Sequence, residues 1–353
     1  MQDAPAAQRY LDFISAESPI VRALLARGGA TGALIAPFVQ ERRFKAGDVM
    51  IAQGTTPEEI LILVEGHATA TESVTTDGQA SPPLVVNQLA QWDVAGEVST
   101  FTGLPAIATL TAKTDVRALG FSAAELGKIS AVSSDTGLAL LHRFAESLAD
   151  KIGRTAHEAD PPASLPEATG DWTERNSWTD HEADDDLWGI TAFHWTRADA
   201  TRDASWHPGV RTVPSGEVIA HNGETCRYLM LLVRGTAVVQ VDMATTRLLA
   251  AQHKRPEHVL IGEEGFFLGR PRKGNVTATT DCRLLEIPAS LFMDIAQASP
   301  HFAEMLLCGV LVALGRKLAD TSEMRARYEA TIGGNWTIWG ADDDTFIRRY
   351  GGL

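Results

Sequence analysis

The pattern of apolar and polar positions divides the chain into strand-like and helix-like stretches. Residues 38–122 contain short apolar runs and small-polar alternation, interrupted at close intervals by glycine turns. Many short strands with frequent glycine turns are typical of a β-barrel or jelly roll. From Ser122 to Arg154 the apolar period becomes helical, and Ser122 is a candidate N-cap. The expected helical stripe consists of Leu138, Leu141, Phe144, Leu148 and Ile152.

The same succession occurs a second time further along the chain. Residues 210–287 are strand-like and residues 288–330 are helical in period. The second helical stripe consists of Leu291, Ile295, Phe302, Leu306, Val310, Leu314 and Leu318. Another helix is expected over residues 8–26, ahead of the first strand-like stretch.

A local pattern of residues repeats within the two strand-like stretches. FKAGDVMIAQGTTPEEILILVEGHA begins at Phe44, and VPSGEVIAHNGETCRYLMLLVRGTA begins at Val213, an offset of 169 residues (213 − 44). GEVSTFTGLPAIATLTAKTDV begins at Gly96, and GEEGFFLGRPRKGNVTATTDC begins at Gly262, an offset of 166 (262 − 96). Two copies at a nearly constant offset predict two domains of one fold in tandem.

The repeat predicts four regions: a first domain over 1–157, a connector over 158–200, a second domain over 201–330, and a tail over 331–353. The connector is acidic and rich in proline, yet it contains Trp172, Trp178 and Trp188. A flexible linker rarely contains so many tryptophans, so we expect it to pack on one or both domains, or to dock a partner. The tail, with Trp336 and Trp339, is expected to be ordered in part.

Composition limits the possible partners and the compartment. The net charge of −14 and the pI near 5.2 oppose non-specific attraction to nucleic acid or to an anionic membrane. The three cysteines lie in apolar stretches without CxxC spacing, which favours buried free thiols in a reducing cytoplasm. No apolar run reaches the ~18 residues of a membrane span, and no signal peptide is visible. We therefore expect a cytoplasmic protein.

The segment from Gly262 to Thr277 combines the features of a compact anion site. Glycines allow backbone N–H groups to turn toward a bound oxyanion. Arg272 offers a two-pronged cation for a phosphate, and Glu263 can accept a hydrogen bond from a sugar hydroxyl. This combination suits a ligand that carries both a ribose and a phosphate.

On these residues the chain resembles the cyclic nucleotide-binding domain family, which includes catabolite-activator-type regulators and the regulatory subunits of cyclic-nucleotide-dependent kinases. The second copy matches the family's phosphate-binding cassette at Gly262, Glu263, Gly269, Pro271, Arg272 and Gly274. The resemblance covers about residues 8–157 and 200–330, and it implies an α+β, mainly β, fold of two tandem β-roll or jelly-roll domains with flanking helices.

The resemblance also implies a site and a ligand. The family's glutamate binds the ribose 2′-hydroxyl, its arginine and backbone amides bind the cyclic phosphate, and the helix after the barrel closes over the base. Carried over to the second domain, this predicts a site for cAMP or cGMP. The expected ligand-binding residues are Gly262, Glu263, Glu264, Gly265, Arg272, Lys273 and Asn275.

Both copies depart from the family's pattern. In the first, Ala106 stands at the arginine position, and losing a charge-assisted contact costs about 1.5–3 kcal/mol. We therefore expect the first domain not to bind cyclic mononucleotides. In the second, Glu264 replaces an apolar residue and Asn275 a threonine, while Lys273 partly offsets the added negative charge. The alternative is that the cassette only shapes a turn that packs on the barrel.

Other kinds of chemistry have little support in the sequence. The chain has no His-x-His pair of the cupin type, no G-x-S-x-G nucleophile elbow and no Walker motif. After residue 330 too few residues remain for a helix-turn-helix, so direct DNA binding is not expected. We predict a non-enzymatic sensor or adaptor acting through a protein partner or a homo-oligomer. The alternative is a scaffold that binds no nucleotide.

Overall fold

The computed structural model describes residues 36–76, 79–158, 209–226, 228–240, 246–250 and 260–332. The helix expected over 8–26 lies outside the described residues, as do the tryptophans of the connector and of the tail.

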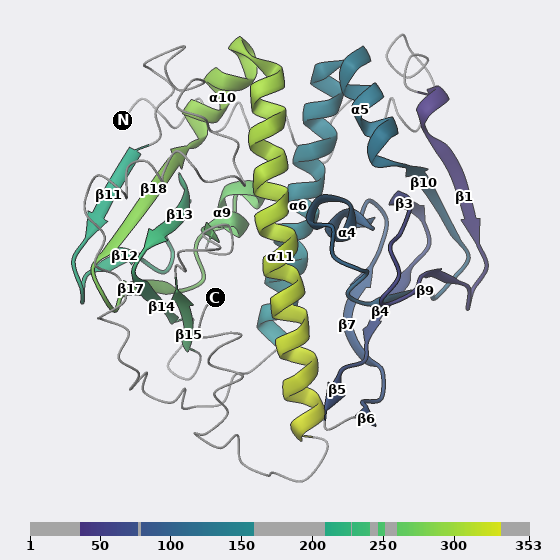
Figure 1. Ribbon diagram of the computed structural model, residues 1–353, viewed down its shortest axis with the longest axis horizontal. Coiled ribbons are helices and arrows are strands. Elements are labelled where there is room, and N and C mark those ends of the chain that lie inside the picture. Colours follow the sequence, from purple (N-terminus) through teal and green to yellow (C-terminus); the bar gives the residue numbers. More distant parts are fainter. Residues whose placement is uncertain are drawn as a thin grey trace. The chain divides into compact units, whose positions relative to one another are not determined.

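The chain divides into two compact units, each described here by itself (Figure 1). The described residues of the first unit are 36–76, 79–158 and 293–332, and those of the second lie between 209 and 292. The C-terminal helix thus has its contacts within the first unit, although it follows the second β segment along the chain. The domain boundaries expected from the repeat remain a prediction.

The first unit is built on two four-stranded antiparallel sheets with strand orders β1-β10-β3-β8 and β2-β9-β4-β7. A two-stranded ribbon, β5-β6, adds to them. The strands are β1 (Gln40–Phe44), β2 (Val49–Ile51), β3 (Ile60–Glu65), β4 (Ala68–Glu72), β5 (Thr75–Thr76), β6 (Gln79–Ala80), β7 (Leu84–Leu89), β8 (Val94–Ala95), β9 (Thr109–Ala112) and β10 (Val116–Phe121).

The burial of the central strand β3 accounts for its apolar sequence. Its residues Ile60 to Val64 are all buried, because both faces of the strand are covered, so it reads as an unbroken apolar run. Leu61 and Leu63 point to one face and join the core between the two sheets. That core also contains Leu89, Ala95 and Leu110.

The helices of the first unit are η1 (Ala36–Phe38), α4 (Glu97–Thr102), α5 (Ala123–Val132) and α6 (Ser134–Glu158). Ser122 caps α5 as expected, since its Oγ accepts from the Glu125 N–H at 3.2 Å while Glu125 accepts from the Ser122 N–H at 2.7 Å. The five residues of the predicted α6 stripe are all buried, which confirms the helical period.

Two further helices follow the second β segment: α10 (Ala289–Ala298) and α11 (Pro300–Ile332). Helix α11 packs on α6, α4, β7 and β4 of the first unit. A Cβ added to Gly315 would lie 2.8 Å from Thr102 Cγ2, so this glycine lets α11 approach α4 closely. Further along, Ser322 Oγ donates to Glu72 Oε2 at 2.5 Å. All seven residues of the second predicted stripe are buried.

The second unit repeats the two four-stranded sheets of the first, strand for strand. Its sheets have the orders β11-β18-β13-β16 and β12-β17-β14-β15, all antiparallel. Helix α9 (Glu263–Leu268) corresponds to α4. The strands are β11 (Gly209–Val213), β12 (Val218–Ala220), β13 (Tyr228–Arg234), β14 (Thr236–Gln240), β15 (Thr246–Ala250), β16 (Leu260–Ile261), β17 (Asn275–Ala278) and β18 (Cys282–Pro288).

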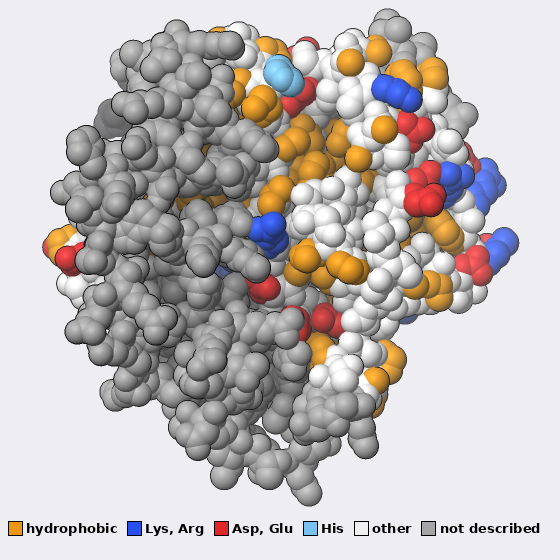
Figure 2. All heavy atoms as spheres, in the orientation of Figure 1, with side chains coloured by type: hydrophobic (Ala, Val, Ile, Leu, Met, Phe, Trp, Pro, Cys, Tyr) orange, Lys and Arg blue, Asp and Glu red, His pale blue; other side chains and the backbone are white. Residues whose placement is uncertain are grey.

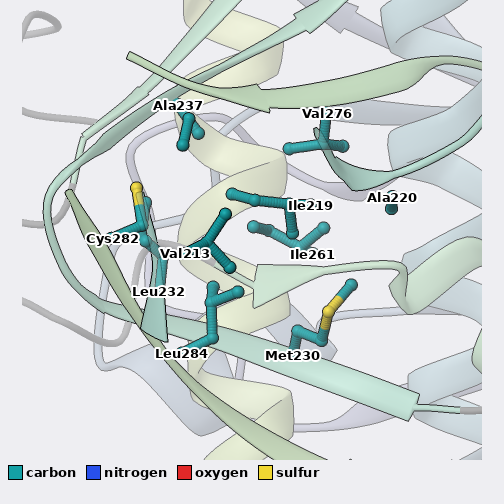
Figure 3. Packing of buried hydrophobic residues seen from close by; sticks show 11 residues of the cluster. Val213, Ile219, Ala220, Met230, Leu232, Ala237, Ile261, Val276, Cys282 and Leu284 are labelled. Carbon is teal, nitrogen blue, oxygen red and sulfur yellow. The ribbon is translucent and has the colours of Figure 1, made fainter. Parts of the chain in front are cut away.

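The core of the second unit lies between these two sheets (Figure 3). Met230 and Leu232, two residues apart on β13, meet Ile261 of β16 and Leu284 of β18 there. The expected mainly β fold of two tandem β-rolls with flanking helices is therefore confirmed.

Charged side chains are intermixed on the described surface. On the face drawn in Figure 2, the Lys and Arg side chains of the first unit alternate with Asp and Glu. Arg42–Glu59, Lys45–Asp115 and Arg117–Glu65 are ion pairs of this kind, with N–O distances of 2.5, 2.8 and 2.7 Å. Such mixing neutralises the local charge, and this part of the surface has no strong field of one sign.

Candidate functional site

The predicted cassette of the second unit is a tight turn followed by the short helix α9. Gly262 precedes the helix with φ 89° and Gly269 ends it with φ 65°, both in the left-handed region that favours glycine. A Cβ at Gly262 would lie 2.6 Å from Arg272 Nη1 and 2.8 Å from Cys226 Sγ. Gly262 is therefore required both by the turn and by the guanidinium that lies against it.

Backbone hydrogen bonds hold Arg272 in place. Its N–H donates to Glu224 O at 2.9 Å, and its carbonyl accepts from the Gly223 N–H at 2.8 Å. The side chain of Glu263, the first residue of α9, is buried. The structure thus places the glycine turn, the arginine and the start of α9 together, as the sequence predicts.

Gly265 has a packing role. A Cβ at this position would lie 2.4 Å from Cys226 Cβ and 2.8 Å from Arg270 O. Because α9 lies so close to these two residues, only glycine fits there.

Glu264 and Lys273 form an ion pair. Lys273 Nζ lies 2.5 Å from Glu264 Oε1, and Arg270 Nη1 lies 3.4 Å from the same oxygen. The negative charge that Glu264 adds to the cassette is therefore balanced by two cations. This arrangement removes the objection that an unpaired carboxylate would repel a phosphate at this turn.

Asn275 ties β17 to the preceding turn. Its Oδ1 accepts from the Asn222 N–H at 2.9 Å. In the first unit Thr109 makes the equivalent bond, with Oγ1 accepting from the Gln53 N–H at 3.1 Å. The replacement of threonine by asparagine therefore preserves a structural hydrogen bond, and this oxygen of Asn275 is occupied by it.

Cys226 is a site residue that the sequence interpretation took for an ordinary buried thiol. Its Sγ donates to the Gly262 carbonyl at 3.0 Å, next to Arg272. Burial raises the pKa of this thiol to about 11, although the Arg272 charge acts in the opposite direction. The thiol therefore stays protonated at neutral pH. The sequence contains no signal for this role, because Cys226 aligns with Pro57 of the first copy, which has no thiol.

The cassette of the first unit has the same backbone as that of the second. Gly96 and Gly103 flank α4 with φ of 86° and 71°. Ala106, aligned with Arg272, donates to Thr55 O at 2.7 Å and accepts from the Gly54 N–H at 2.8 Å. The turn therefore forms in the same way whether or not the arginine is present.

Glu97, the glutamate of the first cassette, forms an ion pair with a lysine of the same unit. Lys151 of α6 has its Nζ 2.5 Å from Glu97 Oε1, with both side chains buried. The same ammonium also donates to the Val94 carbonyl. Glu97 thus accepts from a cation of its own unit at the position where the resemblance expects it to meet a ribose.

The cyclic nucleotide-binding domain model matches residues 41–132 and 210–299, which together cover just over half of the chain. The chain belongs to the cyclic nucleotide-binding domain family. Both matched regions contain the cassettes described above, so this family's domain occurs here as two tandem copies.

Individual relatives are more distant. The chain is 30% identical over 96 residues to a cyclic nucleotide-gated potassium channel of Rhizobium etli, a match that covers 27% of this chain and 25% of the channel. Among solved structures, it is similar to the regulatory domain of Toxoplasma gondii PKA with cAMP, at 16% identity and a TM-score of 0.27, covering 85% of this chain and 95% of the other. A cyclic nucleotide-binding domain from Methylobacillus flagellatus is 15% identical, with a TM-score of 0.35, covering 48% and 95%.

Two general features of the described residues bear on other functions. No cluster of three or more His, Cys, Asp or Glu side chains within them is arranged to hold a metal ion. In the same residues, no helix combines the length and apolar character needed to cross a membrane.

Proposed function

We propose that the chain is a non-enzymatic sensor or adaptor that binds a cyclic mononucleotide, cAMP or cGMP, in the cassette of its second unit. The observation that supports this most directly is the position of Arg272, whose guanidinium lies against the glycine turn that begins α9. An arginine in such a turn offers a bidentate contact to a cyclic phosphate.

The remaining residues of the second cassette fit this role. Glu263 is placed at the start of α9 to accept from a ribose hydroxyl, as the family resemblance implies. Glu264 is paired with Lys273 and Arg270, so that its charge does not oppose the phosphate. In the first cassette Ala106 supplies no cation and Glu97 is held by Lys151, which favours a first unit that takes no cyclic nucleotide.

The response is proposed to begin at the cassette of the second unit. Helix α11, the segment that the family resemblance expects to close over the base, has its contacts on α6 and α4 of the first unit. Phosphate contacts at α9 would therefore draw that short helix inward and change the surface of the second unit itself. We propose that a protein partner, or a second copy of this chain, in the cytoplasm reads this change.

Titration calorimetry of the full chain tests the proposal. We expect cAMP or cGMP to bind, cyclic dinucleotides not to bind, and Arg272→Ala to weaken binding by one to two decades through loss of a charge-assisted contact. Arg211→Ala is the matched control, because Arg211 lies on β11 and bonds Ile219 O and Glu286 outside the cassette. Unchanged affinity in Arg272→Ala would refute the site. No binding by the wild type would favour the scaffold alternative.

A further inference from the structure

One side of α6 has a row of polar side chains that bind a single segment of the first β-roll. The row consists of Arg143, Ser147, Lys151, Arg154 and Thr155, and the segment is residues 87–97. This segment runs from the end of β7 through β8 to the first residue of α4. Spacings of three and four residues place such side chains on the same side of a helix. We call the row the α6 latch.

The middle of the α6 latch binds the backbone of β8. Ser147 Oγ accepts from the Val94 N–H at 3.3 Å, and Lys151 Nζ donates to the Val94 carbonyl. Both backbone polar groups of Val94 are therefore bonded by α6. Backbone acceptors and donors of this kind are present in any sequence, so the side chains of the helix determine whether the contacts form.

The first residue of the latch binds the turn that precedes β8. Trp92 in this turn has φ 75°, in the left-handed region that a bulky residue rarely adopts. Its N–H donates to the Leu63 carbonyl at 2.7 Å, and its own carbonyl accepts from Arg143 Nη2 at 2.8 Å. Since a strained backbone persists only where the surrounding contacts enforce it, Arg143 is one of the groups that fix this turn.

The last residues of the latch bind the end of β7 and the same turn. Arg154 Nη1 donates to the Gln88 carbonyl at 2.6 Å, and Arg154 Nη2 donates to Asp93 Oδ1 at 3.4 Å. Thr155 Oγ1 accepts from Asn87 Nδ2 at 3.3 Å. The latch thus binds the segment along its whole length.

Lys151 extends the latch to α4. Its Nζ lies 2.5 Å from Glu97 Oε1, and both side chains are buried. Helix α11 packs on both α6 and α4 (Figure 1), and Gly315 lets it approach Thr102 of α4. The latch therefore fixes, relative to each other, the two helices on which α11 rests.

The repeat within the chain shows that the latch is not a requirement of the fold. At the offset of 166, Arg143, Ser147 and Arg154 align with Gly309, Ala313 and Asp320 of α11. Glycine and alanine have no polar side-chain group, and an aspartate cannot donate as an arginine does. Only the lysine and the threonine of the row recur, as Lys317 and Thr321. The complete latch is a property of the first copy.

From this row of contacts and its loss in the repeat, we propose that the α6 latch holds α6 closed on the first β-roll without any ligand. The first unit is then a fixed support for α11 at every nucleotide concentration. The contacts are made by the chain's own side chains, so this inference does not depend on the cyclic nucleotide binding proposed for the second unit.

Hydrogen exchange of the full chain, followed by mass spectrometry without nucleotide, tests the latch. Strand β3 is buried along its length and supplies the reference for opening of the whole unit. We expect residues 92–102 of the wild type to be protected to within about tenfold of β3, because the latch is closed in the free protein. Exchange over 92–102 as fast as in an unfolded peptide would overturn the proposal.

The variant Ser147→Ala/Arg154→Met removes two parts of the latch, and Ser147→Ala copies Ala313 of α11. Exchange over residues 92–102 should accelerate at least about tenfold more than exchange in β3, through loss of hydrogen bonds to a buried segment. Ser147→Ala alone is the milder variant if the double variant fails to fold. Lys45→Gln is the control, because it removes an exposed ion pair with Asp115 in the same unit. Equal acceleration in β3, or the same effect in the control, would overturn the latch as a local device.

The support of α11 is tested in the same samples. Loss of the latch should also accelerate exchange over residues 310–322 of α11 relative to β3, because α6 and α4 are no longer fixed beneath it. Protection of α11 that survives the opening of residues 92–102 would contradict the role of the first unit as a support.

Addition of cAMP or cGMP to the wild type separates this inference from the proposed function. Exchange over residues 92–102 relative to β3 should change by less than about twofold, whereas α9 should exchange more slowly if its cassette binds the nucleotide. Slower exchange over 92–102 would overturn a latch that closes without ligand. Unchanged exchange in α9 would refute nucleotide binding in the second unit, and the comparison of latch and control variants would still decide the inference.

Discussion

The two cassettes have nearly the same backbone but differ in the charges they present. In both units a glycine of positive φ precedes a six-residue helix, and a second such glycine ends it. Both have the same pair of backbone hydrogen bonds around the position after the proline. That position is Ala106 in one and Arg272 in the other. The comparison teaches that the glycine pattern is a property of the fold, whereas the charges determine what each turn can bind.

The largest difference we predict concerns the ion pair of the first cassette. Lys151→Met leaves the buried Glu97 carboxylate without its cation, which should lower the free energy of unfolding by about 3–5 kcal/mol at pH 7. The double variant Glu97→Gln/Lys151→Met should recover most of this loss, because it leaves no charge unpaired. Urea unfolding of the three proteins provides the measurement. A single variant as stable as the wild type would show that the pair is not buried in solution.

The two leading glycines should respond differently to alanine. Gly96→Ala should cost about 3 kcal/mol of stability, because φ is positive and the new Cβ would lie 2.5 Å from the Glu59 carbonyl oxygen, which is backbone. Gly262→Ala has similar strain, but its Cβ meets the movable ends of Arg272 and Cys226. We expect Gly262→Ala to lower cyclic nucleotide affinity as well, and Gly96→Ala to leave that affinity unchanged. Calorimetry and thermal melting distinguish the two outcomes.

His142 of α6 aligns with Cys308 of α11, an offset of 166 (308 − 142); His142 is buried, whereas Cys308 is only partly buried. Burial, followed by the Arg143 charge, lowers the pKa of His142 from 6.5 to about 3. The unfolded chain therefore binds a proton that the folded chain does not, and stability falls as pH drops from about 6.5 toward 3.

His142→Cys, which copies the second helix, should remove this dependence. Between pH 7 and pH 5 the wild type should lose about 2 kcal/mol more stability than the variant. Glu146, 3.7 Å from the imidazole, has a raised pKa and contributes with the opposite sign in both proteins. Urea unfolding at the two pH values measures the difference. Parallel losses in the two proteins would show that His142 is not held neutral.

The smallest effect is expected at Glu264. Its pairs with Lys273 and Arg270 are partly exposed, and such pairs contribute a few tenths of a kcal/mol. Glu264→Gln should therefore change stability by less than about 0.5 kcal/mol and cyclic nucleotide affinity by less than about threefold. A tenfold gain in affinity would show that the carboxylate faces the phosphate unbalanced.

Periodicity and the repeat predicted most of the fold. The apolar stripes on α6 and α11 and the Ser122 cap are local features, so the sequence shows them directly. The packing of α11 on the first unit depends on contacts between residues far apart in sequence, such as Gly315 with Thr102, and no periodicity encodes these. The Lys151–Glu97 pair escaped prediction for the same reason.

For the second cassette, the structure shows which expected residues lie together, and their binding roles stay predictions. Arg272 lies against Gly262, next to the start of the helix that begins with Glu263. Asn275 is also expected to bind the ligand, and its Oδ1 accepts from the Asn222 N–H, a bond that the sequence does not show. Cys226 was overlooked because a single thiol in an apolar stretch carries no distinctive pattern.

The stoichiometry of cyclic nucleotide binding is the most direct test of the central claim. The claim is that the two cassettes have the same backbone and that only the second has the charges to bind a cyclic nucleotide. Equilibrium dialysis of the full chain with cAMP or cGMP at about ten times the wild-type Kd should give close to one nucleotide per chain, and Arg272→Ala, whose affinity is lower by one to two decades, should bind about half to one tenth as much at the same concentration. Two nucleotides per chain would contradict the difference between the cassettes. One nucleotide retained by Arg272→Ala, or none bound by the wild type, would contradict the site itself.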